Sequence, residues 1–314
     1  MSRTTIVTGV SSFVGLHLVR RFVAEGDRVV ALHSKPAAVY DGIRKARLDA
    51  VGDVAELIEA DIADAAAINA LIEREQPGLW IHHAGYAENY GSPDYDLAAS
   101  FAVNVTPLPT LFQALEGREC GVIVTGSSAE YSTSDAANRE DDACLPDTPY
   151  GLSKLAETLA ARQLAHRFAV PTRVARLYIP FGTYDNPQKL LAQVIAALDA
   201  GKPVGLSPCT QKRDFIGVSD LCEGYAALAG DMERTPFDIF NLSSGEAVEL
   251  SALLTSIARQ MGADPGLLRF GERAMRPGEP EVSYGANDKA RRLLDWTPRP
   301  LEISLKTDLL ENHQ

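Results

Sequence analysis

Short runs of β-branched residues alternate with amphipathic stretches through the first half of this 314-residue chain. Apolar runs at residues 5–8, 28–32 and 80–83 are separated by longer segments, around residues 14–25 and Val54, whose apolar positions recur with helical spacing. Parallel neighbouring strands need a long crossover rather than a tight hairpin, so this alternation predicts βαβ units. The fold class expected is α/β, with a doubly wound parallel sheet of about six strands.

The alternating pattern continues to residue 178 and then becomes irregular, with many Pro and Gly residues. Further strands are expected at residues 121–125 and 172–178. A smaller domain built from discontinuous segments is expected to follow. The remaining helices are predicted at residues 101–115, 149–168, 188–200 and 250–260.

Charge and composition limit the partners that this chain can have. The formal net charge is −12 and the isoelectric point is near 5.0. Nucleic acids and anionic membranes are held by clustered Lys and Arg, so neither is expected as a partner. The chain opens on a strand without a basic, apolar leader and has no run of about 18 apolar residues, so a cytoplasmic location is expected. Four separate cysteines without a CxxC pair predict neither a metal site nor a disulfide framework.

A glycine-containing turn follows the first predicted strand. It runs from Gly9 to Gly15 and enters an amphipathic helix that ends at Gly26. Glycines allow a tight turn and the close approach of a pyrophosphate to the free N–H groups of a helix N-terminus. Such turns also occur as plain structural features, but the position in the first βαβ unit indicates a dinucleotide site.

The end of the second predicted strand bears on the choice of cofactor. Where NAD-preferring proteins place an Asp or Glu on the ribose hydroxyls, this chain has His33, Ser34 and Lys35. Ser34 and Lys35 suit a 2′-phosphate that a carboxylate would repel, so NADP(H) is the expected cofactor, with NAD(H) as an alternative. The competing interpretation is that Lys35 is a solvated loop residue.

A Tyr-x-x-x-Lys pattern begins the helix predicted at residues 149–168. Tyr150 and Lys154 lie on one helical face, so both side chains can meet the same ligand. The lysine charge stabilises a phenolate and is expected to lower the pKa of Tyr150, which makes it a workable acid or base. Ser127 and Ser128 follow the preceding strand, at the carboxyl edge of the sheet where ligands bind.

Five segments then share the order and spacing of nucleotide-sugar epimerases, dehydratases and reductases. Over nearly its whole length the chain resembles the extended short-chain dehydrogenase/reductase family. The resemblance implies a Rossmann-type domain at residues 1–178 with about 214–240, and a substrate domain at about 179–213 and 241–314. The segments that carry it are residues 8–15, 125–131, 150–154, 212–216 and 276–279, with a similar ending at 290–298.

The resemblance implies a role for each matching residue. Tyr150 is the acid or base, Lys154 lowers its pKa and binds the ribose, and Ser127 polarises the reacting oxygen. Arg213 and Arg276 are expected to hold the diphosphate of the substrate, with surface ion pairs as the alternative. Substrate contacts are further expected from Ser127, Ser128 and Tyr86, in part from a loop at residues 86–95. The expected cofactor contacts are Gly9, Ser11, Ser12, Phe13, Val14, Gly15, His33, Ser34, Lys35, Asp61, Ile62, His83, Ala84, Gly85, Asn104, Tyr150 and Lys154.

Departures from the family pattern narrow the reaction. Ser12 replaces the middle glycine of the turn, which requires a negative φ there. Ile179 stands where the family often has a substrate-contacting Asn. Dehydratases of this family place acids at the positions of Ser128 and Ala129, whereas Glu130 is one residue further on and is expected to point the other way.

Three functions therefore stay open, in order of preference. The first is an NADP(H)-dependent reductase of a 4-keto sugar nucleotide, and the second is a nucleotide-sugar 4-epimerase with tightly held NAD. The third is a cofactor-binding sensor without turnover, while a 4,6-dehydratase is disfavoured. A homodimer joined through the helices at residues 101–115 and 149–168 is also expected.

Overall fold

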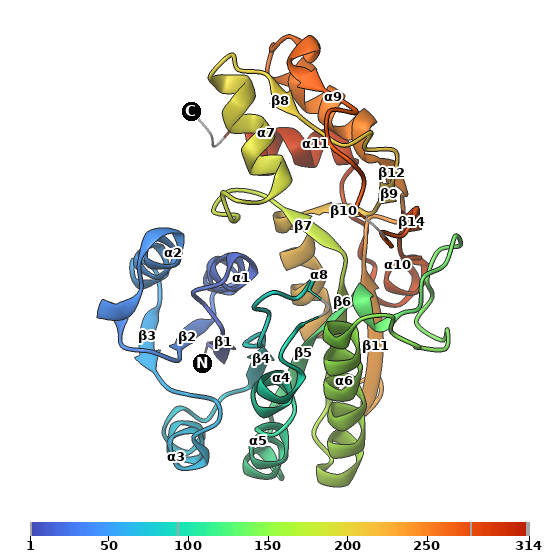
Figure 1. The fold of residues 1–314 in the computed structure, drawn as a ribbon. Coiled ribbons are helices and arrows are strands. Elements are labelled where there is room, and N and C mark those ends of the chain that lie inside the picture. The colour runs from blue at the N-terminus through green and yellow to red at the C-terminus, as the bar shows by residue number, and fades with distance from the viewer. Residues whose placement is uncertain (1, 93, 277, 312–314) are drawn as a thin grey trace.

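Seven parallel strands form the central sheet, in the order β11-β6-β5-β4-β1-β2-β3 (Figure 1). The computed structural model describes residues 2–92, 94–276 and 278–311. The strands are β1 (Thr4–Thr8), β2 (Arg28–His33), β3 (Glu56–Glu59), β4 (Leu79–His82), β5 (Gly121–Ser127), β6 (Thr172–Leu177) and β11 (Phe237–Leu242). The predicted α/β class with a doubly wound, Rossmann-like parallel sheet is confirmed.

Helices cover both faces of the sheet, because alternate strand residues are apolar on both sides. Ile6 and Trp80 belong to one core, whereas their neighbours Val7 and Ile81 belong to the other. The core that contains Val7 is closed by α1 (Phe13–Ala24), α2 (Gly42–Gly52) and α8 (Val218–Gly230). The opposite core is closed by α3 (Ala65–Glu75), α5 (Leu108–Leu115) and α6 (Pro149–Phe168).

The helix predicted at residues 101–115 is wrong, because two helices occupy this stretch. α4 spans Leu97–Asn104 and α5 begins at Leu108, directly after Pro107. Proline lacks an N–H donor and disfavours helical geometry in the preceding residue, so the first helix ends before it and a second begins. The helix placed near Val54 ends earlier, at Gly52, whereas α6 and α9 (Leu250–Gln260) match their predicted bounds.

A third apolar core lies outside the sheet and packs the segments that follow Leu177. Figure 1 shows α7, α9 and α11 gathered above the labels of the sheet strands, at the end where β6 continues into β7. This arrangement agrees with a smaller unit from discontinuous segments, and the boundaries drawn at residues 178, 214 and 240 stay a prediction. Its elements are β7 (Ile179–Phe181), α7 (Leu190–Asp199), β8 (Val204–Gly205), β9 (Lys212–Arg213), β10 (Phe215–Gly217), β12 (Val248–Glu249), α9, β13 (Leu268–Arg269), β14 (Val282–Ser283), α11 (Leu301–Ser304) and the π-helix Leu305–Leu310.

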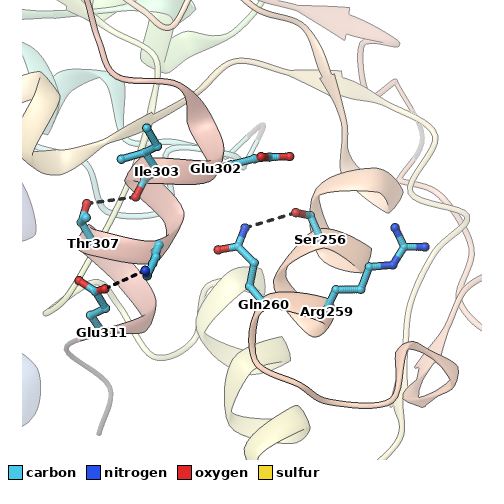
Figure 2. Close-up of a pocket in the computed structure, with 8 residues that line it drawn as sticks. Ser256, Arg259, Gln260, Glu302, Ile303, Thr307 and Glu311 are labelled. Atoms are coloured by element: carbon cyan, nitrogen blue, oxygen red, sulfur yellow. Dashed lines mark hydrogen bonds and ion pairs between the residues drawn. The ribbon is translucent and has the colours of Figure 1, made fainter.

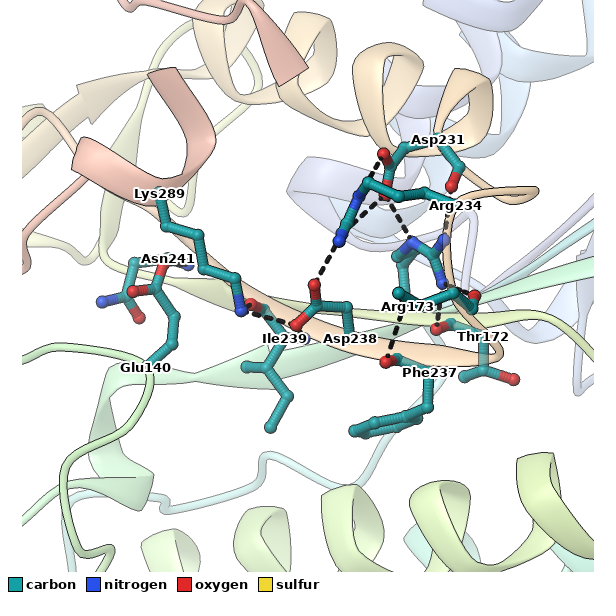
Figure 3. A network of polar contacts seen from close by, with 11 residues as sticks. Glu140, Thr172, Arg173, Asp231, Arg234, Phe237, Asp238, Ile239, Asn241 and Lys289 are labelled. Carbon is teal, nitrogen blue, oxygen red and sulfur yellow. Dashed lines mark hydrogen bonds and ion pairs between the residues drawn. The ribbon is translucent and has the colours of Figure 1, made fainter. Parts of the chain in front are cut away.

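Ion pairs connect the edge strand β11 to the segment before it and to the last part of the chain (Figure 3). Asp238 accepts hydrogen bonds from Arg234 and from Lys289, at 2.5 Å each. Lys289 belongs to α10 (Asp288–Leu294), so this bond ties the last part of the chain to the sheet. On the neighbouring strand, the fully buried Arg173 donates to Asp231 at 2.8 Å. The charges at this edge therefore meet partners that neutralise them.

The length and hydropathy of the described helices show whether any of them could cross a membrane. Within residues 2–92, 94–276 and 278–311, no helix is both long and apolar enough to span a bilayer.

Candidate functional site

The glycine-rich turn lies where β1 meets α1, against the end of β4. Gly9 has φ of +71°, and a Cβ atom on it would lie 2.8 Å from the Cα of Ala84. Only glycine accommodates both the backbone angle and this close approach. Ser12 has φ of −82°, as its side chain requires, and its Oγ accepts a hydrogen bond from the Gly15 N–H at 3.0 Å. Serine is therefore compatible with the backbone at the position of the family's middle glycine. The turn leads directly into the N-terminus of α1, whose free N–H groups favour an anion.

His83 connects this turn to the next strands of the sheet. Its Nε2 lies 3.0 Å from the Ser12 hydroxyl, and its Nδ1 lies 2.9 Å from the Thr125 hydroxyl on β5. Thr125 in turn contacts the Tyr225 hydroxyl on α8 at 2.7 Å. Burial lowers the pKa of His83 to about 3, so the imidazole is neutral near pH 7. A neutral ring can accept from one hydroxyl while donating to the other, which links β1, β4, β5 and α8.

The ends of β2 and β3 hold the other predicted cofactor residues at the same edge of the sheet. His33 is buried, and its Nδ1 lies 2.7 Å from the Lys35 carbonyl oxygen. Ser34 and Lys35 are exposed, so their side chains are free to reach a ligand. Asp61 is also exposed beside the half-buried Ile62, and its Oδ1 accepts from the Ala63 N–H at 2.9 Å.

Ser127 ends β5, and a buried ion pair fixes its backbone. Its N–H donates to Glu130 Oε1 at 2.8 Å, and its hydroxyl accepts from the Ala129 N–H at 3.1 Å. Glu130 is fully buried in the short helix Ser128–Glu130, and its Oε2 accepts from Arg176 Nε at 2.9 Å. Both carboxylate oxygens of Glu130 are therefore engaged inside the protein, and its predicted orientation away from the active site stays a prediction.

Tyr150 and Lys154 lie in the first turns of α6. Thr148 caps this helix by accepting from the Gly151 N–H at 3.0 Å, and Pro149 occupies its first position. Ser127, at the end of β5, lies near enough to the Tyr150 phenol to act to lower its pKa. Lys154 lies one helical turn away from Tyr150.

The expected net lowering of the Tyr150 pKa is wrong for this structure. Burial raises the pKa of Tyr150, and it outweighs the opposing effects of Lys154 and of the nearby Ser127. Lys154 does act in the predicted direction. Its ammonium is itself paired with the buried carboxylate of Glu157, which acts to raise the pKa of Tyr150. Sequence reasoning missed Glu157, although an acid three residues after a lysine on one helix indicates such a pair.

Two aromatic side chains of the predicted loop lie against the ring of Tyr150, and a third packs against one of them. The ring centroids of Tyr90 and Tyr95 lie 5.6 and 5.8 Å from that of Tyr150. Tyr86 packs edge-on against Tyr95 at 5.4 Å, while the Tyr95 hydroxyl donates to the Tyr86 carbonyl at 2.8 Å. The loop therefore lies against the predicted catalytic residue. The sequence signalled the loop but not Tyr90 or Tyr95, since loops have no periodicity that shows which side chains turn inward.

Asn104 anchors this loop to the helix behind it. Its Oδ1 accepts from the Tyr86 N–H at 2.7 Å, and its Nδ2 donates to the Ser153 hydroxyl at 2.9 Å. The side chain is fully buried. In this structure Asn104 supports the loop and α6, and its predicted contact with a cofactor stays a prediction.

The two arginines expected to hold a diphosphate lie on adjoining segments. β9 pairs with β14, which places Arg213 opposite Ser283. The Arg213 guanidinium donates to Glu279 at 3.0 Å and to the Pro280 carbonyl at 2.7 Å, just after Arg276 in the chain. Arg276 is exposed. The fold thus brings their segments together, with Arg213 already paired to a carboxylate.

Arg47 is a further residue that sequence reasoning missed. This buried side chain of α2 donates to the Tyr184 carbonyl, at 2.8 Å from Nε and 2.6 Å from Nη2. It also donates to the Ser11 carbonyl in the glycine-rich turn at 3.3 Å. Arg47 therefore joins the loop that follows β7 to the turn, so the two parts of the fold meet beside the predicted cofactor site.

A cavity of about 570 Å³ lies elsewhere, between α9 and the helical end of the chain (Figure 2). Its wall contains charges of both signs, including Arg259, Glu302 and Lys306, and none of the predicted site residues. Likewise, the described ranges contain no group of three His, Cys, Asp or Glu side chains arranged to hold a metal ion. The turn, Ser127, Tyr150 and Lys154 remain the candidate site.

Comparisons with known proteins identify the family to which the chain belongs. The sequence profile of the NAD dependent epimerase/dehydratase family matches residues 5–243. A dTDP-glucose 4,6-dehydratase of Xanthomonas campestris pv. campestris is 28% identical, with 94% of this chain and 88% of the relative covered. A dTDP-6-deoxy-L-talose 4-dehydrogenase (NAD(P)(+)) of Kitasatospora kifunensis is 27% identical, with 93% and 90% covered.

A solved structure shares the fold from end to end. MoeE5, in complex with UDP-glucose and NAD, superposes with a TM-score of 0.80 at 25% identity, and 98% of this chain and 97% of that chain are covered. The family profile spans more than half of the chain, from β1 to just past β11. The protein is therefore an enzyme of the NAD dependent epimerase/dehydratase family, within the extended short-chain dehydrogenases/reductases.

Proposed function

We propose that this enzyme reduces a 4-keto sugar nucleotide with a nicotinamide cofactor. The observation that carries the proposal is the gathering of Ser127, Tyr150 and Lys154 at the end of β5 and the start of α6, where Ser127 and Lys154 both act on the Tyr150 phenol. Ser127 polarises the carbonyl oxygen, and Tyr150 gives its proton to that oxygen as negative charge develops there. The relative that acts at carbon 4 of dTDP-6-deoxy-L-talose supports this reaction class.

The turn between β1 and α1 fits a dinucleotide. Gly9, with its positive φ, packs directly against the Ala84 backbone, and the turn leads into the N-terminus of α1, whose free N–H groups favour a phosphate. When bound, the cofactor supplies the hydride that carbon 4 receives. Lys154 is close enough to Tyr150 to favour the phenolate, and it is the residue proposed to hold the ribose.

Dehydration needs a further acid, and the local structure disfavours it. The positions of the family's dehydratase acids are Ser128 and Ala129, and the nearby Glu130 has both oxygens engaged by Arg176 and the Ser127 N–H. General acid–base catalysis contributes about 100- to 10,000-fold to such a step. Hydride transfer without dehydration does not require an acidic residue at Ser128 or Ala129.

A 4-epimerase is the second candidate function. It uses the same Ser127, Tyr150 and Lys154, oxidising carbon 4 and then reducing the opposite face of the keto-sugar. One observation favours it, namely that the solved relative MoeE5 holds NAD together with UDP-glucose. NAD that stays bound through purification, with interconversion of two sugar nucleotides and no net change in cofactor redox state, identifies this reaction.

Tyr150→Phe is expected to reduce turnover by at least 100-fold, because it removes the proton donor but little surface. The assay follows nicotinamide absorbance during incubation of NADPH or NADH with a panel of 4-keto sugar nucleotides. Cofactor affinity of the variant, measured by fluorescence titration, is expected to match that of the wild type. If the variant keeps activity within about tenfold of wild type, Tyr150 is not the proton donor. If the wild-type protein binds the cofactor but turns over none of the substrates, the result supports the cofactor-binding sensor without turnover.

Gly9→Ala is expected to weaken dinucleotide binding strongly, because the new methyl group meets the Ala84 backbone 2.8 Å away. Gly117→Ala is the matched control, since Gly117 has φ of +72° with nothing within 4 Å of the added atom. Both variants bear the strain of a left-handed alanine, about 1–2 kcal/mol. Calorimetric titration with NAD(H) and NADP(H) compares them. Equal loss of affinity in the two variants excludes the turn as the cofactor site.

We further propose a preference for NADP(H) over NAD(H), based on the exposed Ser34 and Lys35 after β2. Lys35→Ala is expected to weaken NADP(H) binding by about 1–2 kcal/mol, or about five- to thirtyfold, and to leave NAD(H) binding unchanged. Lys45→Ala, which removes an exposed lysine of α2, serves as the control. Tighter binding of NAD(H) by the wild type reverses this proposal.

The proposed substrate contacts centre on Arg213 and Arg276. Arg276→Ala is expected to weaken binding of a nucleotide sugar by about 1.5–3 kcal/mol, or about 10- to 150-fold, without changing NADPH affinity. Arg269→Ala removes an exposed arginine of β13 and is the control. Because Arg213 already holds Glu279 and Pro280, Arg213→Ala also tests whether this segment is needed for binding. Normal binding by both variants contradicts the diphosphate assignment.

Two proposals concern the context of the enzyme. We propose a homodimer in which α6 contributes to the interface, since Leu152 and Leu159 on this helix are 43% and 54% exposed. We also propose a cytoplasmic location, in keeping with a nucleotide-sugar substrate.

A further inference from the structure

A buried polar cluster lies behind the proposed catalytic lysine. Lys154 Nζ donates to Glu157 Oε2, and both side chains are almost completely buried. The other oxygen, Glu157 Oε1, lies 4.0 Å from Nε2 of His82 on β4. Within the described residues, neither of these two atoms has a hydrogen-bond partner. A buried polar atom without a hydrogen-bond partner destabilises a folded protein. Two such atoms only 4.0 Å apart therefore indicate that they can bond to each other in another state of the protein.

The hydrogen bonding of His82 determines which of its nitrogens carries the proton. Trp80 Nε1, which can only donate, lies 3.4 Å from His82 Nδ1. Burial lowers the pKa of His82 to about 3, so the ring is neutral near pH 7. With Nδ1 accepting from Trp80, the proton of the neutral ring is on Nε2, and it is directed at Glu157 Oε1. A movement of about 1 Å brings the two atoms within hydrogen-bonding distance.

We propose that Glu157 is a positioning residue for Lys154, and that its carboxylate passes from Lys154 to His82 when the ammonium turns toward a bound cofactor. The inference rests on the roles proposed above for Tyr150 and Lys154. Lys154 cannot leave a buried carboxylate without compensation, because an unpaired buried charge is strongly unfavourable. The proton on His82 Nε2 supplies this compensation at a position already 4.0 Å away.

The charge of Glu157 also controls how strongly Lys154 acts on Tyr150. An ionised Glu157 offsets the ammonium and acts to raise the pKa of Tyr150, whereas Lys154 acts to lower it. Burial raises the pKa of Glu157 to about 7 against the opposing effect of Lys154. Its charge is therefore present above pH 7 and lost below it. The titratable groups that face this cluster are Tyr150 and Lys154 of α6, His82 of β4, His83 just after it, Glu130 before α6 and Tyr225 of α8.

Glu157→Gln tests the electrostatic part of the proposal without substrate or cofactor. The amide keeps an oxygen that can accept from Lys154 but removes the negative charge, so the pH at which Tyr150 ionises is expected to shift by about one unit. The shift is downward while Lys154 keeps its proton, and upward where the ammonium, left without its carboxylate, loses its proton. Tyrosinate absorbance is titrated in each protein and in its Tyr150→Phe counterpart, and the difference isolates Tyr150 from the other nine of the ten tyrosines. Circular dichroism on the same samples defines the pH range in which the fold is intact.

Two control variants separate charge from packing. Glu157→Asp keeps the charge and is expected to keep the wild-type titration curve. Thr158→Val changes the adjacent buried side chain, whose hydroxyl has no partner in the described structure, without altering any charge. Its curve is also expected to match the wild type. Coinciding curves for wild type and Glu157→Gln over the folded range overturn the electrostatic role.

The wild-type protein supplies a second measurement, which stands even if Glu157→Gln does not fold. In protein labelled with 15N-histidine, the Nε2 proton of His82 is expected to move downfield on saturation with NAD(H) or NADP(H), as it begins to donate to Glu157. His82→Gln assigns the signal among the six histidines. An unchanged His82 signal at cofactor saturation overturns the transfer of the carboxylate. Absence of cofactor binding instead contradicts the proposed function, and the tyrosinate titration remains interpretable.

Discussion

The close approach of Gly9 to the backbone of Ala84 is the constraint on which the candidate site depends. The chain runs outward from β1 through β2 to β3, then returns to β4 on the other side of β1. Ligands of doubly wound sheets bind at such a reversal, in the crevice at the carboxyl ends of the strands. A side chain at Gly9 would meet the backbone of Ala84, so the glycine allows the turn after β1 to lie directly against the segment that follows β4. The same contact puts His83 within reach of Ser12, so the turn and the neighbouring strands are held together.

Buried ion pairs hold two of the residues proposed to be catalytic, Ser127 and Lys154. The pair of Arg176 and Glu130 orients the backbone of Ser127, since Glu130 accepts from both. Neither charge is stable inside the protein without the other, so the position of the Ser127 hydroxyl is tied to an interaction that is strongly disfavoured to break. Lys154 and Glu157 form a second buried pair. This second pair differs because its lysine is on a flexible stem and has a proposed task elsewhere, and His82 offers the carboxylate another donor.

Local signals predicted much of the fold. α6 was predicted at its observed bounds, and in the structure Thr148 and Pro149 cap and begin it; the glycine-rich turn was predicted from its place after the first strand. The break at Pro107 was missed because apolar spacing continues across it in the sequence. The pairing of Arg213 with Glu279 depends on strands far apart in the chain, so spacing along the sequence carries no sign of it. Tyr90 and Tyr95 were missed for a related reason, since the tertiary packing of a loop decides which of its side chains turn inward.

The shift of one residue between Ala129 and Glu130 shows how local geometry selects chemistry on a shared fold. In the helical turn Ser128–Glu130, the third residue points back into the protein, where its carboxylate completes a capping box with Ser127. An acid held in this way can leave for a substrate only by exposing the buried guanidinium of Arg176 and the Ser127 N–H. The same carboxylate that positions Ser127 is thereby withheld from elimination. This arrangement is in keeping with the proposed hydride transfer at carbon 4, in which Tyr150 gives its proton and no second acid is needed.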